Sequence, residues 1–269
     1  MATNEKRLRV TELDFDNIKE NLKTFLKAQS QFKDYDFEGS GMNILLDVLA
    51  YNTHYLGFNA NMLANEMFLD SASLRSSVVS HAKTLGYEPS SCRAPIATVN
   101  ISLTTTSPTK TMPAGTAFTT TVDGTSYQFV TIADITASNI GNTVPFDSTS
   151  IYEGTYVTVK YVVDTSDAEQ RYMITDNRAD TTTLRVRVQT SVSDSTVTTY
   201  TKATDITQLS SSSTVYYLQE TDSGLFEVYF GDGVVSKGLS DGNIVTLQYV
   251  VTNRTLANGA SSFSSPSSI

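Results

Sequence analysis

The side chains that most often carry out acid–base, nucleophilic or metal chemistry are few in this chain and far apart. His54 and His81 are the only histidines, and neither has a cysteine, histidine or carboxylate at the spacing of a zinc ligand set. No G-x-S-x-G elbow or Cys–His pairing accompanies them. Cys92 is the single cysteine, which rules out an internal disulfide and permits folding in a reducing cytoplasm. We therefore predict no catalytic residues and no metal-binding residues, and interpret both histidines as surface or capping groups.

Carboxylates and glycines near the C-terminal end raise two further questions about chemistry. Asp222, Asp232 and Asp241 lack the D-x-D-x-D-G loop and terminal glutamate of a calcium site, so turn formation is favoured. Gly231-Asp232-Gly233 lacks the Lys-Ser/Thr ending and the following helix of a phosphate loop, and we predict no cofactor. Paired carboxylates of a glycosidase are close in space rather than in sequence. An enzyme that degrades cell-wall polysaccharide therefore stays open as an alternative.

Tyrosines suggest a second alternative, a receptor-binding or glycan-binding tail module. Tyr216, Tyr217, Tyr229 and Tyr249 lie in β-prone segments rich in Thr and Ser, and aromatic rings stack on sugars in many binding modules. Cross-strand packing in the core of a sheet is the more common role of such residues, and we favour it here.

Charge and hydropathy exclude several classes of protein. The formal net charge is −9 and 39% of the residues are hydrophobic. Residues 1–33 carry seven Lys or Arg against five Asp or Glu, whereas the rest carries 12 against 23. An acidic body without a basic patch argues against nucleic-acid binding. No apolar run approaches the roughly 18 residues of a membrane span, and the first residues lack an apolar signal core, so we predict neither membrane anchoring nor secretion.

A one-sided helix is predicted near the N-terminus. Apolar residues recur there at spacings of three and four, which places them on one helix face, and Lys19, Lys23 and Lys27 follow the opposite face. Burial of six such side chains would contribute on the order of 10 kcal/mol as an upper estimate, so we expect this helix to be mobile alone and ordered against a partner. The apolar positions are Leu13, Phe15, Ile18, Leu22, Phe25 and Leu26.

The next segment predicts one long helix or two short ones. Residues 34–41 interrupt the helical pattern with aspartate, glycine and serine, and Ser40 is the predicted N-cap. The apolar residues that follow occupy more than one side, so this helix needs neighbours on several faces. They are Ile44, Leu45, Val48, Leu49, Tyr55, Leu56, Met62, Leu63, Met67, Phe68 and Leu69, with Asn52 among them.

A third helix has recognisable ends. Asp70 or Ser71 is the predicted cap, Gly86 supplies a left-handed residue at the end, and Pro89 prevents continuation. Three helices with this much apolar surface resemble part of a bundle whose remaining helices come from another chain. The predicted buried stripe of the third helix is Leu74, Val78, Ala82 and Leu85.

After Pro95 the pattern changes to short strands rich in Val, Ile, Thr and Tyr. Alternation of apolar and charged residues in 156–163 and 184–188 indicates an antiparallel region with one solvated face. Asp-Gly at 123–124, 232–233 and 241–242 predicts hairpin turns. Residues 261–269 are Ser-rich, and we predict an unpacked tail or linker. The predicted strands are 98–104, 117–121, 127–131, 155–163, 183–189, 215–220, 226–230 and 244–251.

Three segments carry a family resemblance. Residues 36–52 read DFEGSGMNILLDVLAYN and residues 61–72 read NMLANEMFLDSA; residues 113–118 read PAGTAF; and FGDG at 230–233 precedes Gly242-Asn243-Ile244 and Tyr249. With these segments the chain resembles the baseplate J-like family, the wedge proteins of contractile phage tails and related injection machines. Within that family it is most similar to the wedge protein of T-even-like contractile-tailed phages, in its N-terminal portion.

The resemblance extends over residues 10–260 and has two departures. Where relatives continue with G-x-x-G-N after the last strand, residues 253–260 keep only part of that ending. Family wedge proteins also usually continue into a C-terminal dimerisation region, so this chain is either the N-terminal portion of a longer polypeptide or a version that ends early. Ring closure through that region is therefore not predicted from this chain.

The resemblance implies a structural role in the virion, at the tail baseplate, for a protein made in the host cytoplasm. The wedge it implies contains two copies of this protein and a different wedge subunit, with helices of all three in one bundle around the central hub. Tail hub or sheath-initiating proteins are further candidate partners. On host attachment the wedges are expected to rearrange and release sheath contraction, with residues 34–41 and 87–95 as candidate hinges.

We therefore predict a non-enzymatic α+β protein. Residues 1–90 form a helical wedge-bundle segment, residues 91–260 an antiparallel β region of one or two subdomains, and residues 261–269 a tail. The turn-forming motif is Gly231, Asp232, Gly233, Asp241 and Gly242. The predicted partner interface is Leu13, Phe15, Ile18, Leu22, Phe25, Leu26, Ile44, Leu45, Val48, Tyr55, Met62 and Met67.

Overall fold

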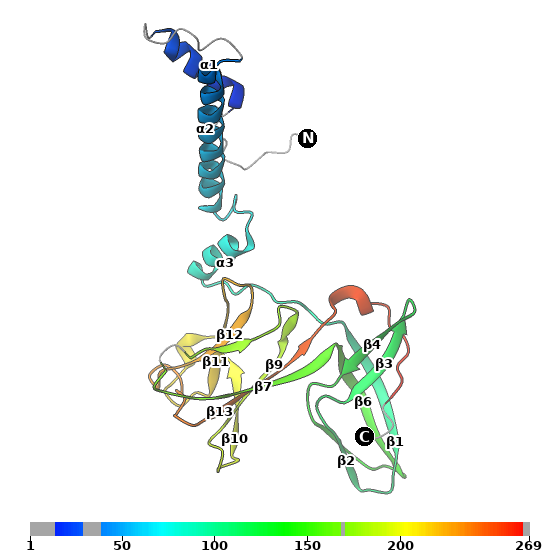
Figure 1. Ribbon diagram of the computed structural model, residues 1–269. Coiled ribbons are helices and arrows are strands. Elements are labelled where there is room, and N and C mark those ends of the chain that lie inside the picture. The colour runs from blue at the N-terminus through cyan, green and yellow to red at the C-terminus, as the bar shows by residue number, and fades with distance from the viewer. Residues whose placement is uncertain (1–13, 29–38, 168–169, 266–269) are drawn as a thin grey trace. The chain divides into compact units, whose positions relative to one another are not determined.

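The computed structural model describes residues 14–28, 39–167 and 170–265. The chain divides into two compact units, Met1–Tyr87 and Glu88–Ile269. The first contains three helices and the second contains thirteen strands and two short 3₁₀ helices among the described residues (Figure 1). The α+β prediction is confirmed.

Helix α1 (Phe15–Lys27) begins where the sequence supplies a cap. The carboxylate of Asp14 accepts hydrogen bonds from the backbone N–H groups of Asp16 and Asn17, which the first helical turn cannot satisfy internally. Ile18 is buried against helix α2, and Lys19 forms an ion pair with Asp47 of that helix. One face of α1 is therefore covered by the chain's own second helix. Leu13 lies outside the described residues.

Helix α2 (Gly41–Glu66) is one continuous helix of 26 residues, and the predicted cap is confirmed. Oγ of Ser40 accepts a hydrogen bond of 3.1 Å from the backbone N–H of Asn43. Residues 67–69, which the pattern included in this helix, lie beyond its C-terminal end. Asn43, Leu46 and Ala50 are its buried residues.

Helix α3 (Arg75–Thr84) begins later than predicted, and neither Asp70 nor Ser71 caps it. The carboxylate of Glu66, at the end of α2, instead accepts hydrogen bonds from the backbone N–H groups of Ser73 and Leu74. The Glu66 side chain, from the preceding helix, therefore caps the N-terminus of α3 in place of a local residue.

For helix α3, the predicted C-terminal end agrees with the structure better than the predicted buried stripe does. Gly86 has a φ of +74°, so the left-handed end of the helix is confirmed. The predicted buried stripe is partly wrong, because Val79 and Ala82 are buried while Leu74 and Leu85 are exposed.

A seven-stranded sheet forms the larger part of the β unit, in the order β7-β13-β9-β10-β11-β12-β8. Every pairing is antiparallel except that of β10 with β11. Its edge strands approach each other, because the hydroxyl of Tyr161 donates a 2.7 Å hydrogen bond to the carbonyl oxygen of Met173. The strands are β7 (Thr155–Val162), β8 (Tyr172–Ile174), β9 (Ala179–Gln189), β10 (Val197–Lys202), β11 (Val215–Glu220), β12 (Phe226–Phe230) and β13 (Ile244–Val251).

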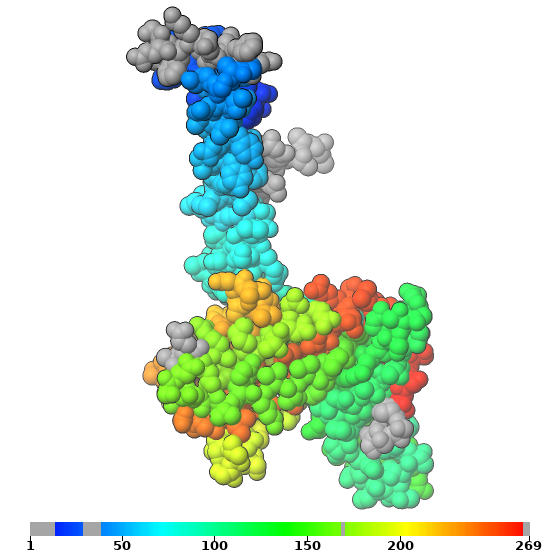
Figure 2. Space-filling model, in the orientation of Figure 1, coloured from blue at the N-terminus to red at the C-terminus, as the bar shows by residue number. Residues whose placement is uncertain are grey.

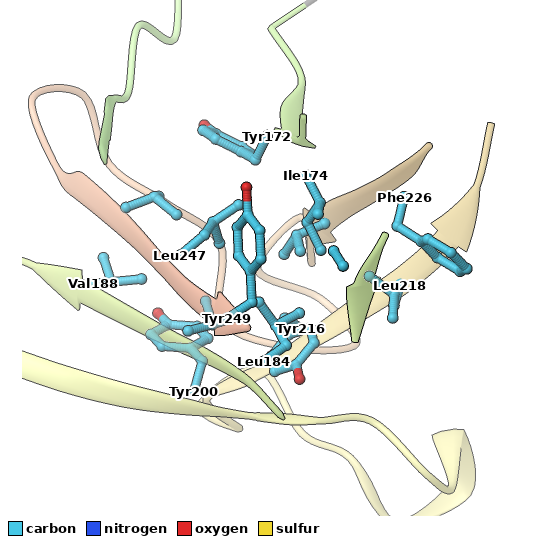
Figure 3. Packing of buried hydrophobic residues seen from close by; sticks show 14 of the residues in the cluster. Tyr172, Ile174, Leu184, Val188, Tyr200, Tyr216, Leu218, Phe226, Leu247 and Tyr249 are labelled. Atoms are coloured by element: carbon cyan, nitrogen blue, oxygen red, sulfur yellow. The ribbon is translucent and has the colours of Figure 1, made fainter. Parts of the chain in front are cut away.

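Aromatic side chains fill the core of this sheet (Figure 3). Tyr249 is fully buried at its centre, and Phe230 receives the rings of Tyr172 and Tyr200 edge-on at 5.5 and 5.4 Å. Tyr216 is buried there as well. The core role favoured for Tyr216 and Tyr249 is therefore confirmed.

A second, four-stranded sheet has the order β1-β6-β4-β3, and β2 pairs with β5 beside it. Phe118, Phe129 and Phe146 are buried in its core. The 3₁₀ helices are η1 (Ile206–Gln208), after β10, and η2 (Arg254–Ala257), after β13. The strands are β1 (Ile96–Thr104), β2 (Thr109–Met112), β3 (Ala117–Val122), β4 (Thr125–Val130), β5 (Ile135–Ser138) and β6 (Thr143–Glu153).

Only one of the three predicted hairpin turns is correct. Asp123 and Gly124 have φ of +50° and +79° between the paired residues Val122 and Thr125, which is the geometry of a tight two-residue hairpin. The Asp-Gly pairs at 232–233 and 241–242 instead belong to the crossover from β12 to β13, strands that are not neighbours. Their glycines have positive φ as expected, but pairing is decided by residues far apart in sequence.

Two buried carboxylates hold the β unit together. Glu153 is fully buried and accepts hydrogen bonds from the hydroxyl of Thr252 and from the backbone and side-chain amides of Asn253. Asp180 accepts from the backbone N–H of Ala94 and from Thr182. Hydrogen bonds to each carboxylate replace the water it lost on burial.

Packing also extends into the Ser-rich end of the chain. The ring of Phe263 contacts Phe129 at 4.9 Å, and Ser264 exchanges two backbone hydrogen bonds with Thr119 on the edge of β3. Residues up to Ser264 therefore belong to the small sheet's surface, further along the chain than the composition indicated.

The corner between α2 and α3 should loosen in acid. Hydrogen bonds from Ser73, first from its hydroxyl and then from its N–H, lower the pKa of Glu66 to about 2. Because the folded pKa lies below the unfolded value, this contribution is present above about pH 4.5 and is lost as pH falls toward 2. Hydrogen exchange should show weaker protection of the Ser73 and Leu74 amides at pH 3 than at pH 6. Glu66→Gln should show that weak protection at pH 6, and Glu20→Gln should not; equal protection in both variants would contradict the assignment.

The β unit should lose stability in alkali. Burial, helped by the nearby Glu88 carboxylate, raises the pKa of Tyr216 to about 12. An unfolded tyrosine ionises near pH 10, so stability should hold below about pH 10 and fall as pH rises toward 12. Denaturant unfolding followed by near-ultraviolet circular dichroism tests this. Tyr216→Phe should flatten the decline, whereas Tyr87→Phe, at an exposed position, should leave it unchanged.

Candidate functional site

Helix α2 buries only one narrow strip of its surface. Asn43, Leu46 and Ala50, at spacings of three and four, lie against α1 and are less than 5% exposed. The other large apolar side chains of the helix, from Ile44 to Leu63, are exposed, and helix α2 is the blue-to-cyan segment of Figure 2. A helix that is apolar on several sides requires several neighbours.

The first exposed stripe, which we call seam A, has the spacing of a coiled coil. Its residues follow one another at intervals of four, three, four, three and four, the heptad pattern that keeps one line of side chains facing a partner helix. Tyr51 and Tyr55 stack within it, with ring centroids 6.5 Å apart. Seam A consists of Ile44, Val48, Tyr51, Tyr55, Phe58 and Met62, between 48% and 63% exposed.

A second stripe, seam B, repeats the same spacing one residue later. Each residue along a helix turns by about 100°, so seam B faces a different direction from seam A. It carries two asparagines, and polar groups inside such a seam select partner and register. Seam B consists of Leu45, Leu49, Asn52, Leu56, Asn59 and Leu63, whose leucines are 45% to 69% exposed.

The predicted interface residues divide between the two helices. On α1, Ile18 is buried by the chain itself and Phe15, Leu22 and Leu26 are half-buried, whereas Phe25 is 64% exposed. The structure therefore covers most of the stripe that we expected partners to cover. All six predicted residues from Ile44 to Met67 are exposed: Ile44, Leu45, Val48, Tyr55, Met62 and Met67.

The predicted partner interface left out five exposed residues of the two seams, although Leu49, Leu56 and Leu63 had been counted among the apolar positions of the helix. Separation of the apolar positions into two heptad repeats would have found them, because each repeat is complete when read by itself. They are Leu49, Tyr51, Leu56, Phe58 and Leu63.

Residues that could support catalysis are occupied by structural contacts. Nε2 of His81 lies 2.9 Å from the carbonyl oxygen of Glu66, which ties α3 to the end of α2. The carboxylate of Glu227 is paired with Arg171 at 3.0 Å and bonded to Gln219. Within the described part of the chain, no group of three His, Cys, Asp or Glu residues is placed to hold a metal ion.

The polar pocket beside Glu227, of about 350 Å³, is also lined by Arg171, Asp164 and Asp167. Hydrogen bonds from the hydroxyl and backbone N–H of Ser166 lower the pKa of Asp164. Such an exposed carboxylate stays ionised and is poorly suited to donate a proton as a general acid.

The two remaining tyrosines of the glycan-binding alternative lie outside the core. Tyr217 and Tyr229 are cross-strand neighbours on β11 and β12, and their rings stack on each other with centroids 5.1 Å apart. Each ring therefore covers one face of the other, which leaves less flat surface for a sugar.

The turn-forming motif serves the β12–β13 crossover. A Cβ on Gly231 would lie 2.0 Å from Oγ and 2.6 Å from the carbonyl oxygen of Ser236, so the chain closes on itself where only glycine fits. Asp232 accepts a hydrogen bond from the N–H of Val234, and Asp241 from that of Thr165. These aspartates hold turns.

The two exposed apolar seams of helix α2 are the surface of a protein built for assembly. Comparison with known proteins specifies which kind. Residues 14–87 match the family model of the helical domain of gp6-like baseplate wedge proteins, and residues 158–258 match that of the third domain of the bacteriophage baseplate wedge protein gp6. The chain belongs to the gp6-like baseplate wedge proteins.

A curated relative agrees with this assignment. The chain is 35% identical over 272 residues to baseplate wedge protein gp6 of Enterobacteria phage T4. The match covers 93% of this chain and 40% of the phage T4 protein, so the chain spans less than half of that relative. None of the described helices is long and apolar enough to cross a membrane.

Substitution at Gly231 should destabilise the β unit more than substitution two residues later. Gly231→Ala forces the Ser236 backbone to shift, which should cost about 1–3 kcal/mol. Gly233→Ala meets no atom within 4 Å and should cost only about 1 kcal/mol for its positive φ. Denaturant unfolding of both variants measures the difference; equal losses would show that the close approach is unimportant.

Proposed function

We propose that this protein is a structural component of a contractile phage tail baseplate wedge, assembled around the central hub through helix α2. The two exposed heptad seams carry this proposal. Burial of one Val, Leu, Ile, Phe or Met side chain contributes about 1.5–3 kcal/mol, so the four such side chains in each seam supply ample free energy for association. Similarity to gp6 of phage T4 supports the wedge role, and membership of the wider baseplate J-like family goes with it.

Two seams on one helix favour two partner helices. Helix α1 occupies a third side through Ile18, which completes the coverage of α2. A second copy of this chain and a different wedge protein would fill the two open sides, as the family resemblance implies. The virion baseplate is then the site of action, after synthesis in the host cytoplasm, and hub or sheath-initiating proteins are candidate outer contacts. No enzymatic step is needed for this role.

The contraction-linked rearrangement would act through rigid bodies. Of the candidate hinges, residues 34–38 lie outside the described residues. The second candidate hinge is residues 87–95. Within it, Glu88 forms an ion pair with Lys202 at 2.7 Å, and Ser91 accepts two hydrogen bonds from Thr181. Ala94 is bonded to Asp180. These contacts make residues 88–94 part of the β unit, so we place the pivot at Gly86 and Tyr87.

Seam-specific substitutions test the assembly proposal. In the full chain, Val48→Asp with Tyr55→Asp removes seam A, and Leu49→Asp with Leu56→Asp removes seam B. Each pair should weaken association with one partner roughly 100-fold or more, because two apolar contacts are replaced by buried charges. Co-purification with a differently tagged copy and with the neighbouring wedge proteins measures this.

Ile140→Asp is the matched control, because Ile140 is 72% exposed and lies in the β unit. Circular dichroism should show all three proteins folded. Undiminished assembly of both seam variants with every partner would refute the proposal, and loss of assembly in the control would show that the effect is not specific to α2.

A further inference from the structure

The outer face of four strands of the large sheet carries charge in an ordered pattern. Alternation along β7, β13, β9 and β10 puts Val245, Leu247, Val186 and Val188 in the core, and their neighbours in sequence face outward. The pairing of the strands aligns these outward residues in rows across the sheet. The central row is Val162, Ile244, Gln189 and Val197, and the cationic row next to it is Lys160, Thr246, Arg187 and Thr199.

An acidic rim borders the central row on its other side. Asp164 follows β7, Asp241 precedes β13, and Asp194 lies in the loop from β9 to β10. All three are exposed, and the N–H of Thr165 donates to Asp241, which joins two of these loops. Hydrogen bonds from Ser166 and Thr196, respectively, lower the pKa of Asp164 and Asp194, so the rim is negative at neutral pH.

The cations of this face have no ionic partner within the described parts of the chain. None of the ion pairs found there involves Lys160, Arg185 or Arg187. Arg185 lies on the same strand as Arg187, one row further from the acidic rim. Unpaired cations are notable because the chain beyond residue 33 is strongly acidic. Val162 and Val197, at the two ends of the central row, are 57% and 52% exposed.

The geometry points to a self-complementary face: we propose that the outer face of β7, β13, β9 and β10 packs against the same face of a second copy. Rows along a strand are about 7 Å apart. A two-fold axis along the central row lays this row on its copy and brings each cationic row over the partner's acidic rim. Lys160 then faces the partner's Asp164, and Arg187 the partner's Asp194. Such an interface is isologous, so each contact occurs twice.

A second copy fits this face better than an unrelated acidic protein, because the cationic row and the acidic rim lie on opposite sides of a central row that carries no charge. The face measures about 19 Å by 20 Å, roughly 400 Å² per copy, which is about half of what a stable interface buries. We therefore expect a weak contact that becomes effective when helix α2 holds two copies together at high local concentration. In this respect the inference rests on the proposed function.

Site-directed crosslinking of the full chain tests the inference. In a Cys92→Ser background, Gln189→Cys lies on the proposed axis and should crosslink to its copy with a short thiol-to-thiol reagent. Thr158→Cys is the matched control on the same face. It lies two rows from the axis, so two copies of it should be about 27 Å apart and should not crosslink.

Charge exchange identifies the contacts. Lys160→Glu and Asp164→Lys, each added to Gln189→Cys, should lower the crosslinked fraction at least threefold. The two together should restore it, because the exchanged charges again attract across the two-fold axis. Added salt should weaken crosslinking of the unexchanged protein as well.

Each outcome of these experiments decides the inference. Crosslinking at Gln189 with rescue by the exchanged pair supports the inference. Equal crosslinking at Gln189 and Thr158, or no rescue, overturns it. If Gln189→Cys fails to crosslink while tagged copies still co-purify through the helices, the face is not a self-interface and the helical assembly stands; if the copies do not co-purify, the proposed function has failed, and crosslinking at high protein concentration still decides the face.

Discussion

The structure depends on one constraint: helix α2 is apolar around most of its circumference, and within the described residues only α1 packs along it. Ile18 of α1 seals the strip formed by Leu46 and Ala50. The apolar side chains of seams A and B are 45% to 69% exposed, although exposure of such surface to water costs about 25 cal/mol per Å². A helix of this composition is stable when other helices complete its surroundings, which is why we regard α2 as a component of an assembly.

The β unit differs from the helices, since its core is closed within the unit and two of its buried carboxylates are hydrogen-bonded there. Glu153 and Asp180 are buried and hydrogen-bonded. The ring of Phe230 packs edge-to-face against Tyr172 and Tyr200 in the aromatic core. A body built in this way moves as a whole rather than deforming. Residues 88–94, which follow α3 in the chain, are bonded to this body and belong to it.

The two kinds of surface would act together in a wedge. Apolar seams give strong association with little dependence on salt, whereas rows of opposite charge give orientation and register with little affinity of their own. In such an arrangement the helices hold the copies together, and the weak charged face orients them. The β units could then separate while the assembly stays associated through the helices. The pivot that we propose for such a change, at Gly86 and Tyr87, lies where the first unit ends.

The sequence by itself determined the features that depend on neighbours a few residues away. The helix periods, the cap at Ser40, the left-handed end at Gly86 and the hairpin at Asp123-Gly124 all arise from such short-range chemistry. Eight strands were predicted close to where they lie, because alternation is also a local signal. Strands β2, β5, β6, β8 and β10 were not predicted. β6 shows the reason, since Pro145 and the positive φ of Ser148 interrupt its pattern.

Only the tertiary structure decided what depends on residues far apart in the chain. Glu66 rather than Asp70 caps α3, because the turn after α2 brings the carboxylate back onto Ser73. The Asp-Gly pairs at 232–233 and 241–242 do not make hairpins, because β13 pairs with β7 and β9. Apolar periodicity showed that the first two helices require cover. Which side the chain covers itself, and which sides it leaves to partners, depends on how α1 packs against α2.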